Sequence, residues 1–232
     1  MGDDPAPFPP PCSILVNNTV ELWDLVSSWN QPVRIDYVLD NAGPELFADL
    51  CLASWLVEAG VASEVHFHTK EFGWFVSDVT PRDFDWLVQQ TMDQANEDMR
   101  ALGARWRGFV RDKRWIIKSD PFWTCADPFK EMPAVAPTLY GDLSKASLVI
   151  LKGDLNYRKL TGDLKWDPTT PFSQVTGAFK PTAFVALRAS KADVIAGLRP
   201  GQAEELTEKE KGLSWMTSGK YGLIQAWIPQ PK

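Results

Sequence analysis

The sequence predicts an α/β fold: a three-layer α/β/α, Rossmann-like domain with a mostly parallel sheet. Segments with the two-residue period of strands alternate along the chain with segments at helical spacing, which is typical of this class. Residues 147–151 form an almost continuous apolar run, as expected for a parallel strand covered on both faces. Hydrophobic residues make up 44% of the 232 residues, which is enough to build such a core.

The chain opens with a Pro- and Asp-rich stretch. Residues 1–17 are expected to form a flexible lead-in, and residues 18–232 are expected to form the α/β domain. The first helix begins after Asn18 or Thr19 as its cap, because apolar residues follow at helical spacing: Leu22, Leu25, Val26 and Trp29.

The first predicted strand covers residues 34–39. The next helix begins at Pro44, since proline is favoured in the first turn of a helix. Glu45 and Asp49 are four residues apart and therefore share one face of this helix. Its opposite, buried face carries Leu46, Leu50, Ala53 and Val57.

A second strand is predicted at residues 64–69, with Val65 and Phe67 on one face and His66 and His68 on the other. The remaining elements are a helix after Thr80-Pro81, a short helix at 137–145, strands at 115–118, 147–151, 183–187 and 221–227, and an exposed charged loop or helix end at 207–211.

Composition excludes several classes of protein. A net charge of −6 and a pI near 5.0 argue against general nucleic-acid binding, which needs a basic surface. No apolar run approaches the ~20 residues that cross a bilayer, and the N-terminus lacks the features of a signal peptide. Cys12, Cys51 and Cys125 are scattered without a Cys-x-x-Cys motif, which favours a reducing compartment. We therefore expect a cytoplasmic location, with the nucleus as a further compartment, and neither membrane nor nucleic-acid partners.

Polar side chains follow three strand-like segments. Asp40 and Asn41 follow the first strand, Asp78 lies in the segment 75–80, and Asp154 follows the apolar run. The carboxyl ends of parallel strands meet at one edge of a sheet, where open α/β folds bind their ligands. Carboxylate and amide oxygens suit Mg²⁺ and Mn²⁺, so the pattern predicts a hard-metal site facing a phosphate.

Structural interpretations remain open for these residues. Asp and Asn also begin turns and cap helices, so Asp40 and Asn41 taken alone do not require a metal. His66 and His68 have the spacing of some zinc sites, but no third His or Cys ligand is indicated. Half-buried histidines without a metal are therefore the favoured interpretation.

Residues 152–159 combine features that suit an anion. Gly153 permits a tight turn after a buried strand, and the N–H groups of the following helix can bind an anion. Arg158 can donate two hydrogen bonds to a phosphate. Lys191 follows another predicted strand and lies at the same sheet edge. The alternative is that residues 152–159 are only a solvated, basic helix start and that Lys191 is a surface lysine. The sequence contains no P-loop motif.

Four motifs occur together: VLDNAGPEL at 38–46, WFVSDVT at 74–80, KGDLNYRKLTGDLKW at 152–166 and KYG at 220–222. This combination resembles the damage-control phosphatase family, in the eukaryotic sugar-phosphate branch that also includes the acidic-residue (protein-glutamate) methyltransferase type. The resemblance runs from about Arg34 to the C-terminus.

The resemblance implies roles for particular residues. Asp40, Asn41 and Asp78 would bind a divalent metal (Mn²⁺, Co²⁺ or Mg²⁺), and Glu45 would support them. Asp40, Asp78 and Asp154 would be catalytic, with Asp154 orienting or deprotonating the attacking water. The substrate would contact Asp40, Asn41, Asp154, Leu155, Asn156, Tyr157, Arg158 and Lys191.

Two departures from the family pattern stand out. The branch carries an Arg-Thr-x-Lys signature, and the segment 188–191 keeps both cations but has Ala189 in place of the threonine. Family members also carry a mostly helical region before the Asp-Asn motif, where this chain has 39 residues. Part of the substrate pocket is therefore expected to be absent.

The function expected from these residues is metal-dependent hydrolysis of sugar phosphates such as fructose 1-phosphate, with a small phosphorylated metabolite as partner. Two alternatives stay open. One is a SAM-dependent protein-glutamate O-methyltransferase, although the segment 40–44 has one glycine rather than a glycine-rich SAM loop. The other is a truncated, non-catalytic remnant that binds metal or a partner.

Overall fold

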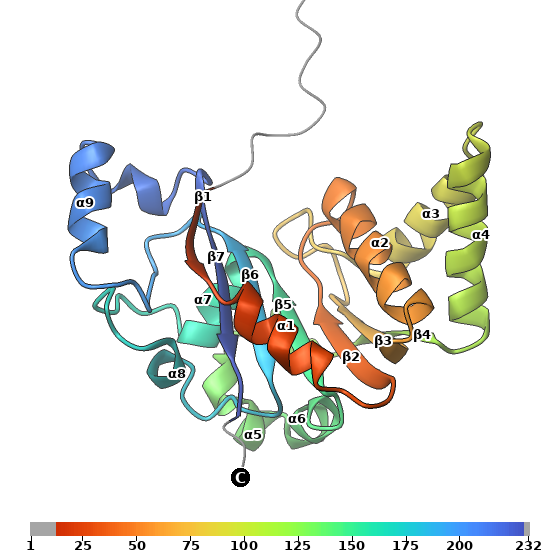
Figure 1. Ribbon diagram of the computed structural model, residues 1–232, viewed down its shortest axis with the longest axis horizontal. Helices are drawn as coiled ribbons and strands as arrows, with labels where there is room; N and C mark the ends of the chain where they lie inside the picture. Colours follow the sequence, from red (N-terminus) through yellow and green to blue (C-terminus); the bar gives the residue numbers. More distant parts are fainter. Residues whose placement is uncertain (1–12, 230–232) are drawn as a thin grey trace, which may run out of the picture.

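Seven strands form one sheet in the spatial order β1-β7-β6-β5-β2-β3-β4 in the computed structural model, which describes residues 13–229 (Figure 1). All neighbouring pairs are parallel except β6 and β7, which are antiparallel. The strands are β1 (Ser13–Asn17), β2 (Val33–Val38), β3 (Ala62–Thr69), β4 (Trp115–Ser119), β5 (Leu148–Lys152), β6 (Phe184–Ala189) and β7 (Tyr221–Trp227).

Helices cover both faces of the sheet, so the predicted three-layer α/β architecture is confirmed. One face carries α1 (Thr19–Ser27), α2 (Pro44–Glu58), α3 (Pro81–Met92) and α4 (Glu97–Arg111). The other face carries α5 (Met132–Val135), α6 (Pro137–Leu143), α7 (Gly153–Thr161), α8 (Phe172–Val175) and α9 (Gln202–Lys209). Short 3-10 turns lie at Pro121–Thr124, Phe129–Glu131 and Leu213–Met216.

The alternation of side chains along β2 explains the two layers of core. Ile35 and Tyr37 pack with α2 on one face, whereas Val38 packs with α7 on the other. The helix starts follow their sequence signals: Pro44 and Pro81 occupy the first turns of α2 and α3, and Thr80 forms a capping box with Asp83.

The order of the strands places a switch point between β2 and β5. After β2 the chain continues to β3 and β4 on one side, and then returns to β5 on the other side of β2. The following helices, α2 and α7, pack on opposite faces, so a crevice opens between the carboxyl ends of these two strands.

Two expectations for local structure are corrected. Residues 13–17, expected in a flexible lead-in, form the edge strand β1, which pairs with β7; residues 1–12 of that lead-in lie outside the described part. The segment 75–80 is not a strand, because Phe75 (φ 44°) and Val76 (φ 72°) have left-handed backbone conformations. Its pairing is a single antiparallel bridge between Asn41 and Asp78.

The charged segment 207–211 mostly continues α9, which was one of the two possibilities for it. Cys51 and Cys125 are free thiols in the part of the chain described. Among residues 13–229, none of the helices has the length and apolar character needed to span a bilayer.

Candidate metal and phosphate site

The crevice at the switch point brings Asp40, Asn41 and Asp78 together. Asp40 and Asn41 follow β2, and the loop after β3 returns to pair Asp78 with Asn41. Backbone hydrogen bonds fasten this loop: Val79 N–H donates to the Asp40 carbonyl, and Ala42 N–H donates to the Ser77 carbonyl, both at 2.8 Å. The three residues that the sequence predicts as metal ligands, called the trio below, therefore lie together.

The side chain of Asn41 connects the neighbouring acidic groups. Its amide nitrogen donates to Asp40 Oδ2 at 2.8 Å and to Glu45 Oε2 at 2.9 Å. Its amide oxygen accepts a hydrogen bond from Ser77 Oγ at 2.7 Å. Glu45 thus contacts Asn41, and the carboxylates of Asp40 and Glu45 are held close together.

A buried lysine that the sequence did not predict as part of the site lies next to Asp78. Lys70 follows β3 directly and is 1% exposed. Its ammonium donates to the Leu39 carbonyl at 2.7 Å and lies 3.6 Å from Asp78 Oδ2, beyond hydrogen-bond length. The detectable signal was a lysine at the end of an apolar strand.

Electrostatics at the trio favour an added cation. Burial, together with the charges of Glu45 and Asp78, raises the pKa of Asp40 to about 7. Burial also raises the pKa of Asp78, although Lys70 opposes this shift. Asp78 Oδ2 is buried and accepts no hydrogen bond within the described chain. An orphaned carboxylate oxygen among oxygen donors fits Mg²⁺, Mn²⁺ or Co²⁺.

Gly153 allows β5 and α7 to approach Asp40. Its φ is +84°, and a Cβ built on it would lie 1.9 Å from Asp40 Oδ2. Only glycine tolerates both this backbone conformation and this approach. The start of α7, with its free N–H groups, therefore lies directly beside the Asp40 carboxylate.

Lys152, the residue before α7, pairs with the acidic face of α2. Its ammonium lies 3.2 Å from Glu45 Oε1 and 3.0 Å from Asp49 Oδ1. Burial raises the pKa of Asp49 to about 6 despite this lysine. The shared face of Glu45 and Asp49 was predicted, but their partner Lys152 was not.

Asp154 and Lys191 lie on the other side of the crevice. A cavity of about 340 Å³ is lined by Asp40, Asp154 and Lys191, among others. Asp154 Oδ1 accepts hydrogen bonds from the Lys191 backbone N–H (3.0 Å) and from Arg188 Nε (2.7 Å). The Lys191 side chain is exposed at the mouth of this cavity.

Arg188 holds the loop that carries Lys191. Its side chain is fully buried, and it donates to the carbonyls of Ala192 (2.9 Å) and Val194. Its guanidinium lies 4.3 Å from the ring centre of Tyr157. Arg188 is therefore occupied by the protein, and Lys191 is the member of the 188–191 segment that can meet a substrate.

The other residues expected to contact substrate divide into two groups. Leu155 and Arg158 line a second cavity beside the first. Asn156 and Tyr157 are buried: Asn156 Nδ2 donates to the carbonyls of Lys152 (2.7 Å) and Leu39 (3.2 Å), which ties α7 to the sheet. These two side chains support the site from below.

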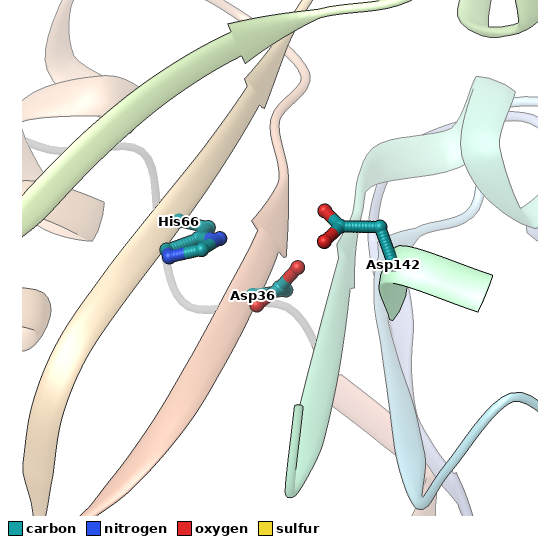
Figure 2. Close-up of side chains that lie close together, drawn as sticks. All are labelled: Asp36, His66 and Asp142. Carbon is teal, nitrogen blue, oxygen red and sulfur yellow. The ribbon is translucent and has the colours of Figure 1, made fainter. Parts of the chain in front are cut away.

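A separate cluster, Asp36, His66 and Asp142, places one ligand atom of each residue within 4.8 Å of the others (Figure 2). Asp36 and His66 come from β2 and β3, and Asp142 comes from α6. Arg34 donates to both oxygens of Asp36 at 2.7 Å and bonds Asp142 at 3.0 Å. Lys118 also donates to Asp142 at 2.7 Å. Cations of the protein already occupy these carboxylates.

The pKa values show that the two carboxylates of that cluster are paired with cationic or hydrogen-bonding groups of the protein. Burial acts to raise the pKa of Asp36, but hydrogen bonds from His68 and Arg34 hold it below the ordinary value. Arg34 and Lys118 likewise overcome burial and hold the pKa of Asp142 well below its usual range. His68 Nε2 lies 2.9 Å from Asp36 Oδ2, whereas neither ring nitrogen of His66 has a hydrogen-bond partner within the described chain. Both rings are more buried than expected, and the interpretation that they bind no metal stays a prediction.

The fold and the site together define an α/β protein with an oxygen-donor cluster at its switch point, beside a lysine and a helix N-terminus. Comparison with known families is more specific. The chain belongs to the damage-control phosphatase ARMT1-like domain family, whose domain matches residues 11–206. The family resemblance in the sequence is thereby confirmed.

Curated relatives are named "Damage-control phosphatase ARMT1". The protein of Rattus norvegicus is 48% identical over 217 residues, which are 91% of this chain and 49% of the relative. The proteins of Homo sapiens and Danio rerio are 43% and 42% identical, over 91% and 93% of this chain and 49% of each relative. The chain thus spans about half the length of these relatives.

Among solved structures, a DUF89 family protein from Pyrococcus horikoshii aligns with a TM-score of 0.44 and 18% identity. The alignment covers 90% of this chain and 52% of that protein.

Proposed function

We propose that this chain is a metal-dependent phosphatase that hydrolyses phosphorylated sugars, with fructose 1-phosphate-like esters as the expected type. The observation that carries the proposal is the trio of Asp40, Asn41 and Asp78, in which the pKa values of Asp40 and Asp78 are raised and Asp40 lines the same cavity as Lys191. The carboxylates need a cation, and Lys191 presents a positive charge to an anion. Such a site suits a phosphate bound together with a metal ion. The name of the curated relatives supports the reaction class.

Asp40, Asn41 and Asp78 would hold the divalent cation, Mn²⁺, Co²⁺ or Mg²⁺. When bound, such an ion polarises a phosphoryl oxygen and offsets charge as the ester bond breaks. Glu45 and Lys70 would keep two of these side chains in place, since they contact Asn41 and approach Asp78.

The phosphate would lie between Lys191 and the first turn of α7. The free N–H groups of this nine-residue helix favour an anion, and Gly153 lets the start of the helix approach Asp40. Asp154 is the candidate for orienting or deprotonating water: Oδ1 is held by Arg188 and Lys191 N–H, whereas Oδ2 accepts no hydrogen bond from residues 13–229.

The proposed partner is a small phosphorylated metabolite, without nucleic acid or membrane. The acidic composition supports this assignment. The scattered cysteines, which favour a reducing compartment, support a proposed cytoplasmic location, with the nucleus as a further compartment.

The purified chain is expected to release phosphate from fructose 1-phosphate in the presence of Mn²⁺ or Co²⁺, and not with excess EDTA. The measurement is a screen of sugar phosphates against Mn²⁺, Co²⁺ and Mg²⁺, together with a transfer assay that uses labelled SAM and a glutamate-containing protein. SAM-dependent transfer without metal would support the methyltransferase alternative. No activity in either assay would support the non-catalytic one.

Lys191→Met is expected to lower kcat/KM for a sugar phosphate about ten- to a hundredfold. Methionine keeps the apolar stem, whereas the lost charge-assisted contact is worth about 1.5–3 kcal/mol. Metal affinity, measured by titration calorimetry without substrate, should not fall, because removal of a nearby cation relieves repulsion. The matched control is the exposed Lys165→Met. Unchanged turnover in Lys191→Met, or a parallel loss of metal binding, would contradict the assigned role.

A further inference from the structure

A second cavity, of about 230 Å³, is lined by residues of α7 and of the loop that carries Asp78. Consecutive residues of α7 line the two cavities, Asp154 the first and Leu155 the second. Drug-sized ligand sites occupy about 300–1,000 Å³, so this one suits a group no larger than a single sugar unit. Its lining includes Trp74, Phe75, Cys125, Leu155, Arg158 and Asp163.

The aromatic wall of this second cavity is fastened to the expected metal ligands. Asp78 N–H donates to the Trp74 carbonyl at 3.1 Å, and Ser77 Oγ donates to Asn41 at 2.7 Å. Between them, Phe75 and Val76 are held at positive φ, which is unfavourable for a β-branched residue. Backbone strain of this kind persists where the surroundings impose it, often at ligand sites.

The charged groups around the second cavity are already paired. Arg158 donates two hydrogen bonds to Asp163, at 2.8 and 2.7 Å. The ammonium of Lys159 donates to the carbonyls of Phe122 (2.7 Å) and Cys125 (2.9 Å). Lys191, by contrast, forms no side-chain ion pair with any described residue. A phosphate is therefore better placed on the Lys191 side, which leaves the second cavity for a neutral group.

The remaining chemistry of the second cavity suits a polyol ring. Trp74 packs edge-on against Phe75, with ring centres 5.3 Å apart, so the wall presents aromatic surface. The indole N–H of Trp74 is buried and finds no acceptor among residues 13–229. An apolar aromatic surface with a few convergent polar groups is typical of a small-molecule site that fixes orientation.

We propose that Trp74 and Phe75 form the subsite for the sugar moiety of the phosphorylated substrate, with the phosphate directed toward Lys191. This inference rests on the proposed phosphatase function and gives its substrate an orientation. The loop that carries the aromatic wall also carries Asp78, so recognition of the sugar and of the phosphoryl group is built on one segment, residues 74–78.

The test measures binding without turnover. The Mn²⁺-loaded chain is titrated with the phosphonate analogue of fructose 1-phosphate, in which a C–P bond replaces the ester, and separately with inorganic phosphate. Trp74→Leu is expected to lower the affinity for the analogue about tenfold and to change the affinity for inorganic phosphate less than about twofold. Trp74→Phe keeps an aromatic surface and should bind the analogue nearly as the parent chain does. Trp86→Leu, an exposed tryptophan of α3, is the matched control.

Two results would overturn the subsite. One is an unchanged affinity of Trp74→Leu for the analogue. The other is an equal loss for the analogue and for inorganic phosphate, which would indicate general damage to the site. Failure of the proposed function itself looks different, because the parent chain would then neither bind the analogue nor hydrolyse sugar phosphates.

Discussion

Asp40→Asn is expected to abolish metal-dependent phosphate release and, at the same time, to stabilise the metal-free protein. Removing a residue that only hydrogen-bonds to a metal ligand lowers metal affinity or activity about 10–100-fold. Removing a ligand itself should therefore lower activity more than about a hundredfold. The gain in stability follows from the raised pKa. A shift from 3.8 to about 7 means that the ionised carboxylate costs the folded state up to about 4 kcal/mol at ~1.4 kcal/mol per pKa unit.

The sign of the pH dependence follows from the direction of that shift. A group whose folded pKa is raised contributes stability below its unfolded pKa, near 4, and this contribution is lost as the pH rises through about 7. The melting temperature of Asp40→Asn in EDTA should therefore exceed that of the parent chain by more at pH 8 than at pH 5. With Mn²⁺ at pH 8 the difference should shrink or reverse, because a hundredfold excess over Kd stabilises the binding-competent chain by about 2.7 kcal/mol.

Asp142→Asn is the control for Asp40→Asn, because the pKa of Asp142 is lowered rather than raised. Its loss should destabilise the protein at pH 8 and leave metal-dependent activity intact, since Asp142 is paired with Arg34 and Lys118. If Asp40→Asn melts below the parent chain in EDTA at pH 8, burial and the neighbouring carboxylates do not raise the pKa of Asp40 in the metal-free protein.

Gly153→Ala is expected to lose most activity through a single added methyl group. The new Cβ would overlap Asp40 Oδ2, at 1.9 Å, so either the carboxylate or the start of α7 must move. A left-handed alanine adds about 1–2 kcal/mol of its own. The measurements are Mn²⁺ affinity, phosphate release and thermal melts, and both affinity and turnover should fall by more than about tenfold.

Gly201→Ala separates the two costs. Gly201, at the start of α9, has a similar φ of +80°, but a Cβ there meets no atom within 4 Å. This variant should lose about 1–2 kcal/mol of stability and keep full activity. Equal effects in the two variants would show that the backbone conformation, rather than the approach to Asp40, accounts for the loss.

Much of the site could be inferred from local sequence because strand ends define one edge of a parallel sheet. Asp40, Asp154 and Lys191 each follow a strand, and the topology alone brings them together. Asp78 reaches the same place by another route, since its segment is a turn that is positioned by the bridge to Asn41 and by backbone hydrogen bonds of its neighbours to Asp40 and Ala42. The apolar residues of the segment 75–80 are typical of a strand, but hydrogen bonds to Asp40 and Ala42 hold this segment in a turn instead.

The counter-charges of the site could not be inferred in the same way. Lys70 bonds a carbonyl 31 positions away, and Arg188 bonds a carboxylate 34 positions away. Such pairings depend on how the strands are ordered in space, which composition and periodicity do not report. The strand at 221–227 was predicted, but its antiparallel direction and the edge strand β1 were missed for a related reason: both depend on long-range pairing at the far end of the sheet.

The short strand β1 also has a bearing on how copies of this chain behave toward one another. Along β7, the residues Tyr221–Trp227 are mostly apolar, and β1 satisfies backbone groups on one side of them. A shortened form that began after Asn17 would present β7 as a bare, apolar edge. Unpaired edges of this kind act as templates for strand addition, so the five residues of β1 help to keep the sheet from self-associating.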